Sequence, residues 1–224
     1  HRLFFITDAA QTAGVFDIDM QAMGLDAVAF TGHKGLLGPQ GIGGIALTDR
    51  LAAEMEPLLS GGTGSLSDSE EIPAFLPDKF EPGTMNLPGI YGLHAALSYL
   101  ETEGVGTIRA REQRLAHMLS DGLSAFPQAR MPGPADWSNR APVVSVDFDG
   151  HDNAEIAAYL ADEHGILTRC GLHCAPFAHK TLGTFPQGMV RFSPGSFTTE
   201  EEIERAVLAV RDTGIGFSAE AAER

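Results

Sequence analysis

The sequence is poor in cysteine and in positive charge. Its 224 residues include two cysteines, Cys170 and Cys174, whereas a secreted protein of this size that relied on disulfides would normally have more. This scarcity predicts a reducing, cytoplasmic setting in which thiols are kept for chemistry. The formal net charge is −15, and no cluster of lysine or arginine stands out. Such a surface repels phosphate backbones and anionic lipids, so we expect no nucleic-acid partner and no membrane partner.

Long apolar runs and targeting signals are also lacking. No apolar run approaches the roughly 20 residues that span a bilayer. The N-terminus lacks the charged and apolar pattern of a signal peptide. The hydrophobic share of 43% is ordinary for a globular α/β protein. The chain starts at His1, directly before the strand-like run Leu3-Phe4-Phe5-Ile6, so we expect a fragment whose upstream part is absent.

Apolar periodicity, together with glycine and proline, predicts strands that alternate with helices. The expected strands are 3–6, 27–30, 45–47, 143–148, 166–169 and 189–192. The expected helices are 49–57, 88–103, 105–126, 153–164 and 199–212. A long loop covers 57–83, and Thr199 with Glu202 has the spacing of a capping box. This alternation favours an α/β fold.

Glycine and proline between residues 127 and 134 indicate a domain boundary. We therefore predict a first domain over 1–129 and a second, small α+β domain over 130–224. The first part has too few strands for a sheet that is covered on both faces. That shortage is consistent with an absent upstream segment.

One of the three lysines lies among glycines directly after a predicted strand. Lys34 is part of Thr31-Gly32-His33-Lys34-Gly35, where a ligand can approach closely because few side chains crowd the backbone. Schiff-base chemistry needs a lysine of this kind, partly desolvated so that its amine can attack a carbonyl. A solvent-facing loop lysine is an equally good interpretation of the position alone.

Two polar residues follow the preceding strand, where α/β sheets place ligand contacts. Asp8 could pair with a protonated pyridine nitrogen and so keep the ring an effective electron sink. Gln11 could hydrogen-bond the ring's phenolic oxygen. Taken singly, Asp8 could instead cap a turn and Gln11 could simply be solvated.

Four motifs, in one order and with similar spacing, resemble those of a known family. The first two regions resemble the cofactor motifs of class V aminotransferases, and the last two resemble the group II cysteine desulfurases within that family. The motifs are Asp8-Ala9-Ala10-Gln11, then Thr31 to Gly35 with Gly38 to Gly43, then Phe80 to Asn86, and finally Arg169 to Pro176. The resemblance extends over nearly the whole chain. It implies part of the large domain of a fold type I enzyme dependent on pyridoxal 5'-phosphate, followed by a small α+β C-terminal domain.

The resemblance also implies roles for residues of the first domain. Lys34 would bind pyridoxal 5'-phosphate covalently as a Schiff base, with Asp8 at the pyridine nitrogen and Gln11 at the phenolic oxygen. Thr31 and His33 match positions that bind the phosphate. Thr84 matches a threonine that reaches the phosphate of the neighbouring subunit, so a homodimer is implied.

In the second domain, Cys174 would be the nucleophile that accepts sulfur from L-cysteine and releases alanine. Only a thiolate does this well, so a neighbour must stabilise it or take its proton, and His173 is adjacent in sequence. Arg191 matches the arginine that clamps the substrate carboxylate, and Arg169 matches another arginine near the active site. A sulfur-acceptor protein and a part in iron–sulfur cluster assembly are further implications.

Other interpretations of the cysteines remain open. Cys170, Cys174, His173 and His179 could form a zinc site, although a single C-x3-C pair is a weak signal. A disulfide between the two cysteines would block the proposed nucleophile. Family members generally carry a different residue at position 170, so a second thiol near the persulfide is also conceivable.

Three alternatives to a cysteine desulfurase follow. The parent enzyme could act on selenocysteine, or it could be a class V aminotransferase or lyase in which Cys174 is incidental. The 224 residues could also form an inert fragment or a dimerisation module, because part of the cofactor cleft would lie upstream. We expect weak or no cofactor binding by this chain alone.

Overall fold

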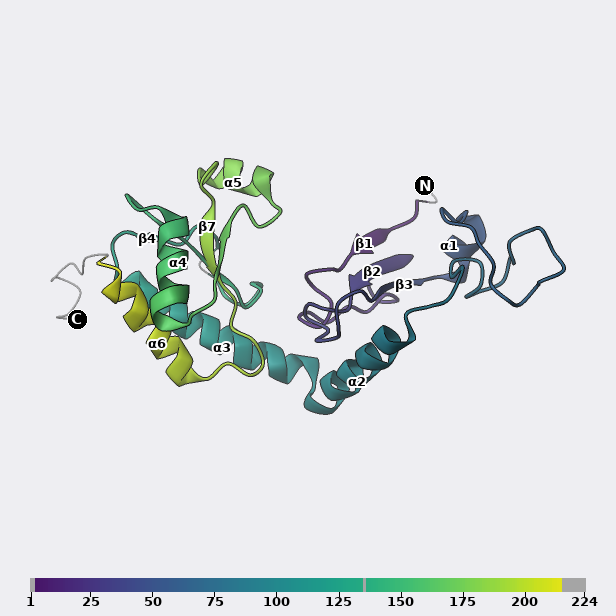
Figure 1. The fold of residues 1–224 in the computed structure, drawn as a ribbon, viewed down its shortest axis with the longest axis horizontal. Coiled ribbons are helices and arrows are strands. Elements are labelled where there is room, and N and C mark those ends of the chain that lie inside the picture. Colours follow the sequence, from purple (N-terminus) through teal and green to yellow (C-terminus); the bar gives the residue numbers. More distant parts are fainter. Residues whose placement is uncertain (1–2, 135, 215–224) are drawn as a thin grey trace. The chain divides into compact units, whose positions relative to one another are not determined.

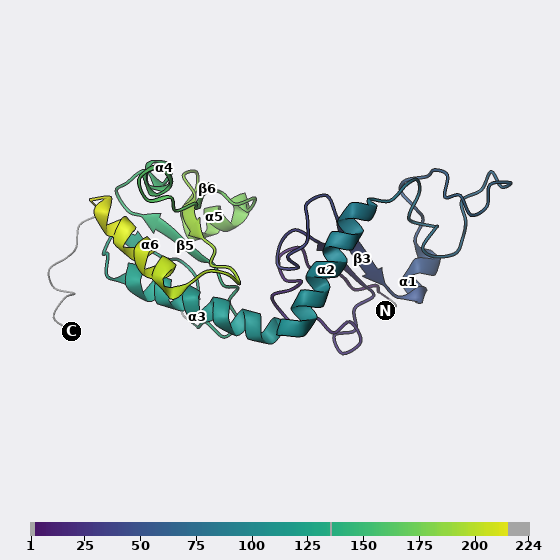
Figure 2. The ribbon, with the colours of Figure 1, turned by 60° about the horizontal axis from the view of Figure 1, so that its bottom comes forward.

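The computed structural model describes residues 3–134 and 136–214. Its chain divides into two compact units, His1–Gly106 and Thr107–Arg224. Each unit has its own sheet and its own helices, which are labelled in Figures 1 and 2. Among the residues described, no helix is both long and apolar enough to cross a membrane.

The first unit has a three-stranded mixed sheet in the order β1-β2-β3 (Figure 1). Strand β1 (Ile6–Asp8) pairs in parallel with β2 (Ala27–Thr31), and β2 pairs antiparallel with β3 (Gly43–Leu47). Phe30 lies opposite Gly44 in this register, and a Cβ on that glycine would meet the Phe30 ring at 2.7 Å. The glycine at the start of β3 therefore makes room for an aromatic ring.

A buried carboxylate joins β2 to its neighbours. Asp26 accepts a hydrogen bond from the Phe5 amide at 2.9 Å and forms an ion pair with Arg50 at 2.6 Å. The hydrogen bond from Arg50 holds the pKa of Asp26 below its ordinary value, and the Phe5 amide acts in the same direction. Arg50 belongs to helix α1 (Asp49–Glu54), so a single carboxylate fixes both the entry to β1 and the start of α1.

Helix α2 (Leu87–Glu103) begins at Asn86, whose side chain accepts a hydrogen bond from the Gly89 amide at 3.1 Å. Of its apolar residues only Leu100 is buried. A cavity of about 510 Å³, lined largely by apolar side chains, opens beside the second half of α2. The buried core of this unit is accordingly small and centres on Ala9, Leu25 and Val28.

The second unit is an antiparallel four-stranded sheet with four helices. The strands are β4 (Ala129–Arg130), β5 (Val144–Phe148), β6 (Arg169–Gly171) and β7 (Met189–Phe192), in the order β4-β5-β7-β6. The helices are α3 (Val105–Ser124), α4 (Asn153–His164), α5 (Pro176–Leu182) and α6 (Glu200–Asp212). Strands β5 and β7 pack with α3, α4 and α6 in one extended core.

Two contacts show how closely this core is built. A Cβ on Gly122 would meet Val207 at 2.6 Å, so the glycine lets α3 and α6 lie side by side (Figures 1 and 2). Asn153, fully buried at the start of α4, accepts a hydrogen bond from the Phe148 amide and donates to Asp147 and to the carbonyl of Gly188. Its side chain thereby ties strand β5 to the turn before β7.

Several expected boundaries differ in the structure. The strand expected at 3–6 is β1, which begins only at Ile6, and Leu3, Phe5 and Ile6 are exposed rather than buried. The strand expected at 166–169 is β6, which begins at Arg169. Helix α5 and the short strand β4 lie where the sequence predicted neither a helix nor a strand.

The domain boundary predicted between residues 129 and 130 stays a prediction, and the compact units are divided elsewhere. The division falls between Gly106 and Thr107, because α3 packs its apolar face into the core of the second unit. That face consists of Leu115, Ala116, Leu119 and Leu123. The helices α2, α3, α4 and α6 and the irregular segment between α1 and α2 agree with expectation to within a few residues.

Candidate functional site

The predicted cofactor residues of the first unit follow two adjacent parallel strands. Strand β1 ends at Asp8 and β2 ends at Thr31, with Asp8 opposite Ala29 in the register. The carboxyl ends of parallel strands meet at one edge of a sheet. Asp8 and Thr31 therefore lie at this edge, and the turns that follow them carry Gln11, His33 and Lys34.

The Asp8 carboxylate is held by a local turn. Its Oδ1 accepts a hydrogen bond from the Ala10 amide at 2.8 Å, as an aspartate does at the start of a turn. The Ala9 amide donates to the carbonyl of Ala29 at 2.7 Å, and Ala9 is fully buried. The chain after β1 is thus anchored to β2, while Asp8 itself stays exposed to receive a ligand.

The turn after β2 presents Lys34. The Thr31 hydroxyl and Nδ1 of His33 are 2.9 Å apart and share a hydrogen bond. The exposed Lys34 amine makes no hydrogen bond or ion pair within the part of the chain that the structure describes. Gly35 packs against Gly14 so closely that a Cβ on Gly14 would run into the Gly35 carbonyl. Both glycines therefore allow the lysine turn to lie against the segment that follows β1.

Thr84 lies on a loop that is tied to the glycine-rich segment after Lys34. The Asn86 side chain donates to the Gly41 carbonyl at 3.0 Å and caps α2 with its oxygen. Thr84 itself is exposed. This placement is compatible with a contact to a neighbouring subunit, but the role of Thr84 stays a prediction.

The donor set at this edge fits pyridoxal 5'-phosphate. Among residues 3–134 and 136–214, the Lys34 amine and one Asp8 oxygen have no partner, and the Thr31 hydroxyl is paired with the His33 imidazole. These are the groups that would meet the aldehyde, the pyridine nitrogen and the phosphate of this cofactor.

A second group of predicted residues lies in the second unit, where two arginines flank a thiol. Arg169 on β6 and Arg191 on β7 are direct partners in the antiparallel register, so their side chains leave the same face of the sheet. Nη2 of Arg169 is 3.9 Å from Sγ of Cys174. Cys174 also interacts electrostatically with Arg191. The structure thus brings Arg169, Arg191 and Cys174 together.

Arg191 has a buried hydrogen-bond donor that no protein group satisfies. Its Nε lies out of contact with solvent and has no partner in the described residues. Burial lowers the pKa of Arg191, and the charge of Arg169 acts in the same direction. A half-buried guanidinium with an unsatisfied Nε next to a second cation is a site for an anion, and a carboxylate matches its forked geometry.

Cys174 lies in a tight turn between β6 and α5. The Ala175 amide donates to the Leu172 carbonyl at 2.8 Å, and the two central residues have positive φ, 49° at His173 and 60° at Cys174. Two successive left-handed residues are typical of a type I′ turn, which normally takes glycine or asparagine. This backbone presents the Cys174 side chain to solvent.

His173 is held in one orientation by a hydrogen bond of its ring. Its Nε2 is 2.9 Å from the Arg169 carbonyl, which can only accept, so Nε2 carries the proton. Burial lowers the pKa of His173, and the charges of Arg191, His179 and Arg169 add to the effect, although the bond to the carbonyl opposes it. When the ring is neutral, a proton on Nε2 leaves Nδ1 as a proton acceptor.

The second cysteine faces away from this group. Cys170 follows Arg169 in β6, and successive strand residues point to opposite faces. Burial raises the pKa of the Cys170 thiol, and the charge of Asp152 at the start of α4 raises it further. Both cysteines are free thiols. In the described ranges, 3–134 and 136–214, no three His, Cys, Asp or Glu side chains are grouped so that they could hold a metal ion.

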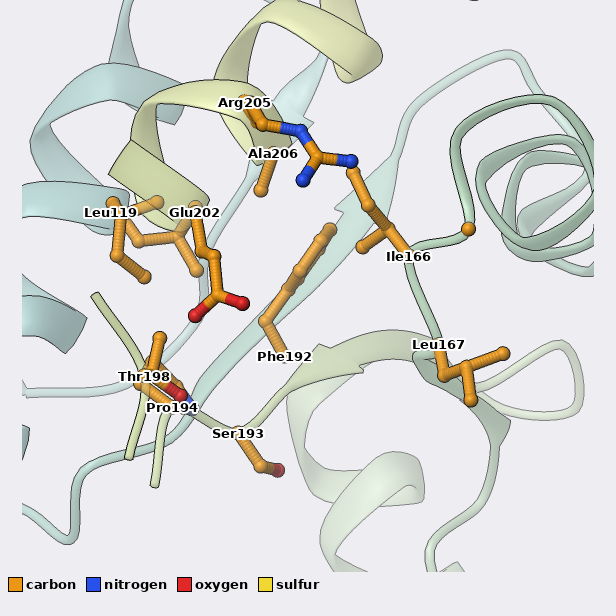
Figure 3. Close-up of a pocket in the computed structure, with 12 residues that line it drawn as sticks. Leu119, Ile166, Leu167, Phe192, Ser193, Pro194, Thr198, Glu202, Arg205 and Ala206 are labelled. Carbon is orange, nitrogen blue, oxygen red and sulfur yellow. The ribbon is translucent and has the colours of Figure 1, made fainter. Parts of the chain in front are cut away.

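A cavity elsewhere in the second unit contains none of the predicted site residues. It has a volume of about 250 Å³ and lies between α6, the end of β7 and the segment 165–167 (Figure 3). Its charged side chains already have partners, since Glu202 bonds the Thr199 amide and Arg205 donates to the His164 carbonyl. We therefore place the candidate chemistry at the Lys34 and Cys174 groups. The sequence suggested His179 only as a possible zinc ligand. Its burial beside His173 has no signal in the sequence.

Comparison with known proteins identifies the family. The profile of the family described as Aminotransferase class-V matches residues 1–206, so the chain belongs to this family. The match confirms the resemblance and the predicted α/β fold.

Among its relatives are proteins named as cysteine desulfurases. A probable cysteine desulfurase of Methanothermobacter thermautotrophicus is 34% identical over 89% of this chain and 50% of its own length. One of Pyrococcus abyssi is 36% identical over 89% of this chain and 49% of its own length. The apo structure of the cysteine desulfurase of Thermococcus onnurineus matches with a TM-score of 0.85 at 34% identity, over 94% of this chain and 52% of that one. The chain thus spans about half the length of the relatives it matches.

Proposed function

We propose that this chain is part of a cysteine desulfurase that depends on pyridoxal 5'-phosphate, with Cys174 as the sulfur acceptor. The observation that carries this proposal is the exposed thiol of Cys174, 3.9 Å from the Arg169 guanidinium and in electrostatic interaction with Arg191, whose Nε has no partner among the described residues. A transaminase has no need of such a thiol. The relatives named as cysteine desulfurases support the same assignment.

In this proposal the edge of the first sheet holds the cofactor. Lys34 would bind it covalently, Asp8 would pair with its ring nitrogen, and Gln11 would contact its phenolic oxygen. Thr31 and His33 would hold the phosphate through the paired hydroxyl and imidazole. When bound, the cofactor supplies an electron sink that makes the Cα–H and Cβ–S bonds of an amino acid labile.

Arg191 would orient the substrate. Its position on β7, between β5 and β6, gives the guanidinium a rigid base, and its buried Nε has no partner in the described part of the chain. A substrate carboxylate would satisfy that donor and fix the direction of the substrate side chain. The neighbouring guanidinium of Arg169 would favour the thiolate form of Cys174.

Cys174 would then take the sulfur. Its thiolate attacks the sulfur of L-cysteine, a new S–S bond forms, and the substrate's Cβ–S bond breaks. The proton of the substrate thiol ends on carbon, so that alanine leaves and a persulfide anion remains on Cys174. His173, adjacent to Cys174 in sequence and bonded through Nε2 to the Arg169 carbonyl, would take the proton of Cys174 beforehand through Nδ1.

The wider setting belongs to the same proposal. Thr84 would reach the phosphate of a second copy of the enzyme in a homodimer. A sulfur-acceptor protein would collect the persulfide, for use in processes such as iron–sulfur cluster assembly, in the cytoplasm. The net charge of −15 supports the absence of nucleic-acid and membrane partners.

The test is alanine release by the full-length enzyme, loaded with cofactor and given L-cysteine without added thiol. We expect Cys174→Ala to lower the rate by at least on the order of 100-fold, while Cys170→Ala, which alters a thiol on the opposite face, retains activity. Persistent alanine release by Cys174→Ala would contradict the persulfide step. A keto-acid product would instead indicate transamination, and faster turnover of selenocysteine would indicate a selenocysteine lyase.

A further inference from the structure

Helix α5 is anchored by one buried histidine. His179 is 2% exposed and is the only buried residue among the seven of this helix. Its Nδ1 is 2.7 Å from the hydroxyl of Thr184, which is itself buried. The Thr184 amide also donates to the His179 carbonyl at 2.9 Å. The imidazole is therefore held in one orientation by the segment that follows the helix.

The ring of His179 packs against the ring of His173. Their centroids are 5.7 Å apart with an interplanar angle of 49°, within the range of tilted aromatic pairs. His173 in turn donates to the Arg169 carbonyl at 2.9 Å, and Arg169 contacts the Cys174 thiol. A continuous set of contacts thus runs from the buried helix anchor to the exposed sulfur.

The turn that carries Cys174 needs such support. His173 and Cys174 both adopt positive φ without being glycine or asparagine, which costs free energy at each residue. The turn has a single backbone hydrogen bond of its own, from Ala175 to Leu172. A strained turn of this kind persists only where its surroundings hold it, and the His179 ring is the buried group in contact with its first strained residue.

We propose that His179 is a positioning residue: through its ring contact with His173 it fixes the turn that holds Cys174 beside Arg169. The role assigned to His179 rests on the proposed function of Cys174, whereas the experiment that tests it requires no enzymatic activity. The Thr184 hydrogen bond orients the ring, and the ring contact does the positioning.

Two substitutions separate the ring from the hydrogen bond. His179→Asn keeps a polar group in reach of Thr184 but removes the ring, whereas His179→Phe keeps a ring and removes the hydrogen bond. Both are made in the full chain with Cys170→Ala, so that Cys174 is the one thiol. The measurements are hydrogen exchange of the Ala175 amide by NMR and the rate of Cys174 alkylation by iodoacetamide.

We expect His179→Asn to speed exchange of the Ala175 amide by about 2- to 10-fold, the range that loss of one aromatic contact allows. The same variant should change the alkylation rate of Cys174 by a similar factor, because the thiol leaves the Arg169 guanidinium. His179→Phe should stay within about twofold of the parent in both measurements. His117→Asn is the matched control, since it removes a histidine ring that packs on Trp137 at 5.4 Å, and it should leave both values unchanged.

The proposal is overturned if His179→Asn behaves as the parent, or if His179→Phe disturbs the turn as much as His179→Asn does. If His179→Asn does not fold, His179→Leu provides the comparison without a ring and must differ from His179→Phe in the same way. Neither measurement requires cofactor or cysteine. A full-length enzyme that released no alanine would refute the desulfurase assignment, whereas the two measurements on this chain would still report on His179.

Discussion

At the scale of single residues, Glu112 on α3 is a half-buried carboxyl that holds the segment after β7. It accepts a hydrogen bond from the buried hydroxyl of Ser196 at 2.9 Å. Burial raises the pKa of Glu112 above its ordinary value of 4.5, and the Ser196 bond and the charge of Arg111 offset only part of the rise. The folded protein therefore favours the protonated form more than the unfolded chain does.

This pKa shift predicts how Glu112 affects stability as pH changes. A group with a raised pKa in the folded state stabilises the fold fully below its unfolded pKa and loses that contribution as pH rises through the folded pKa. The free energy of unfolding of the parent, minus that of Glu112→Gln, should thus be larger near pH 4 than near pH 7. Denaturant unfolding at several pH values measures this difference.

Ser196→Ala provides the internal check on Glu112. This substitution removes the hydrogen bond that favours the charged carboxylate of Glu112. The stabilising contribution of Glu112 to the free energy of unfolding should therefore fall more steeply between acid and neutral pH. If the difference in free energy of unfolding between the parent and Glu112→Gln is independent of pH, or increases with pH, burial does not determine the pKa of this carboxyl.

At the scale of elements, helix α6 starts with a complete capping box. The Thr199 hydroxyl accepts from the Glu202 amide at 3.2 Å, and the Glu202 carboxylate accepts from the Thr199 amide at 2.9 Å. Thr199→Ala should lower the free energy of unfolding by about 1 kcal/mol. Thr199→Ser, which keeps the hydroxyl, should recover most of that loss. Equal denaturation midpoints for all three proteins would rule out a stabilising role for the cap.

Elements whose signals are local could be predicted from the sequence. The capping box lies within four residues, and the expected start of α6 was correct for that reason. Helix α5 was missed although Pro176 opens it and Gly183 follows it, which is the usual placement of these two residues around a helix. Its seven residues are too few to show a clear apolar period, so these two end signals stand alone in the sequence.

Elements that depend on a distant partner were less predictable. Strand β1 begins where its pairing with β2 begins, with Ile6 opposite Ala27. The apolar run before Ile6 does not indicate where that pairing starts. The candidate site also combines residues with local sequence signals and contacts that depend on distant partners. Motifs indicated Lys34, Asp8 and Cys174, whose roles stay predictions, whereas the Arg169–Cys174 contact and the buried ring of His179 arise from register and packing.

At the scale of the whole molecule, the two units differ in how much core they contain. The second unit buries an extended set of apolar side chains from α3, α4, α6, β5 and β7, whereas the buried core of the first centres on three residues. Residues such as Leu58, Tyr91 and Phe5 leave the first unit with large exposed apolar groups. Burial of apolar area is the main driving force for folding, so the units should differ in autonomy.

We expect a polypeptide of residues 107–224 to unfold cooperatively on its own. Residues 1–106 should show no cooperative transition and weak amide protection. Thermal unfolding followed by circular dichroism, with hydrogen exchange on each polypeptide, tests both statements. A cooperative transition in residues 1–106 alone would mean that the small core and the Asp26–Arg50 ion pair suffice.

The four-residue turn around Cys174 limits how far a sulfur bound there could travel. A thiol on a long loop can be carried across a surface, but this one is fixed by a backbone hydrogen bond on one side and a helix on the other. Only rotation about its own side-chain bond remains. Under the proposed function, the recipient protein would have to bring its own reactive group to the enzyme, and delivery would be governed by the shape of that recipient.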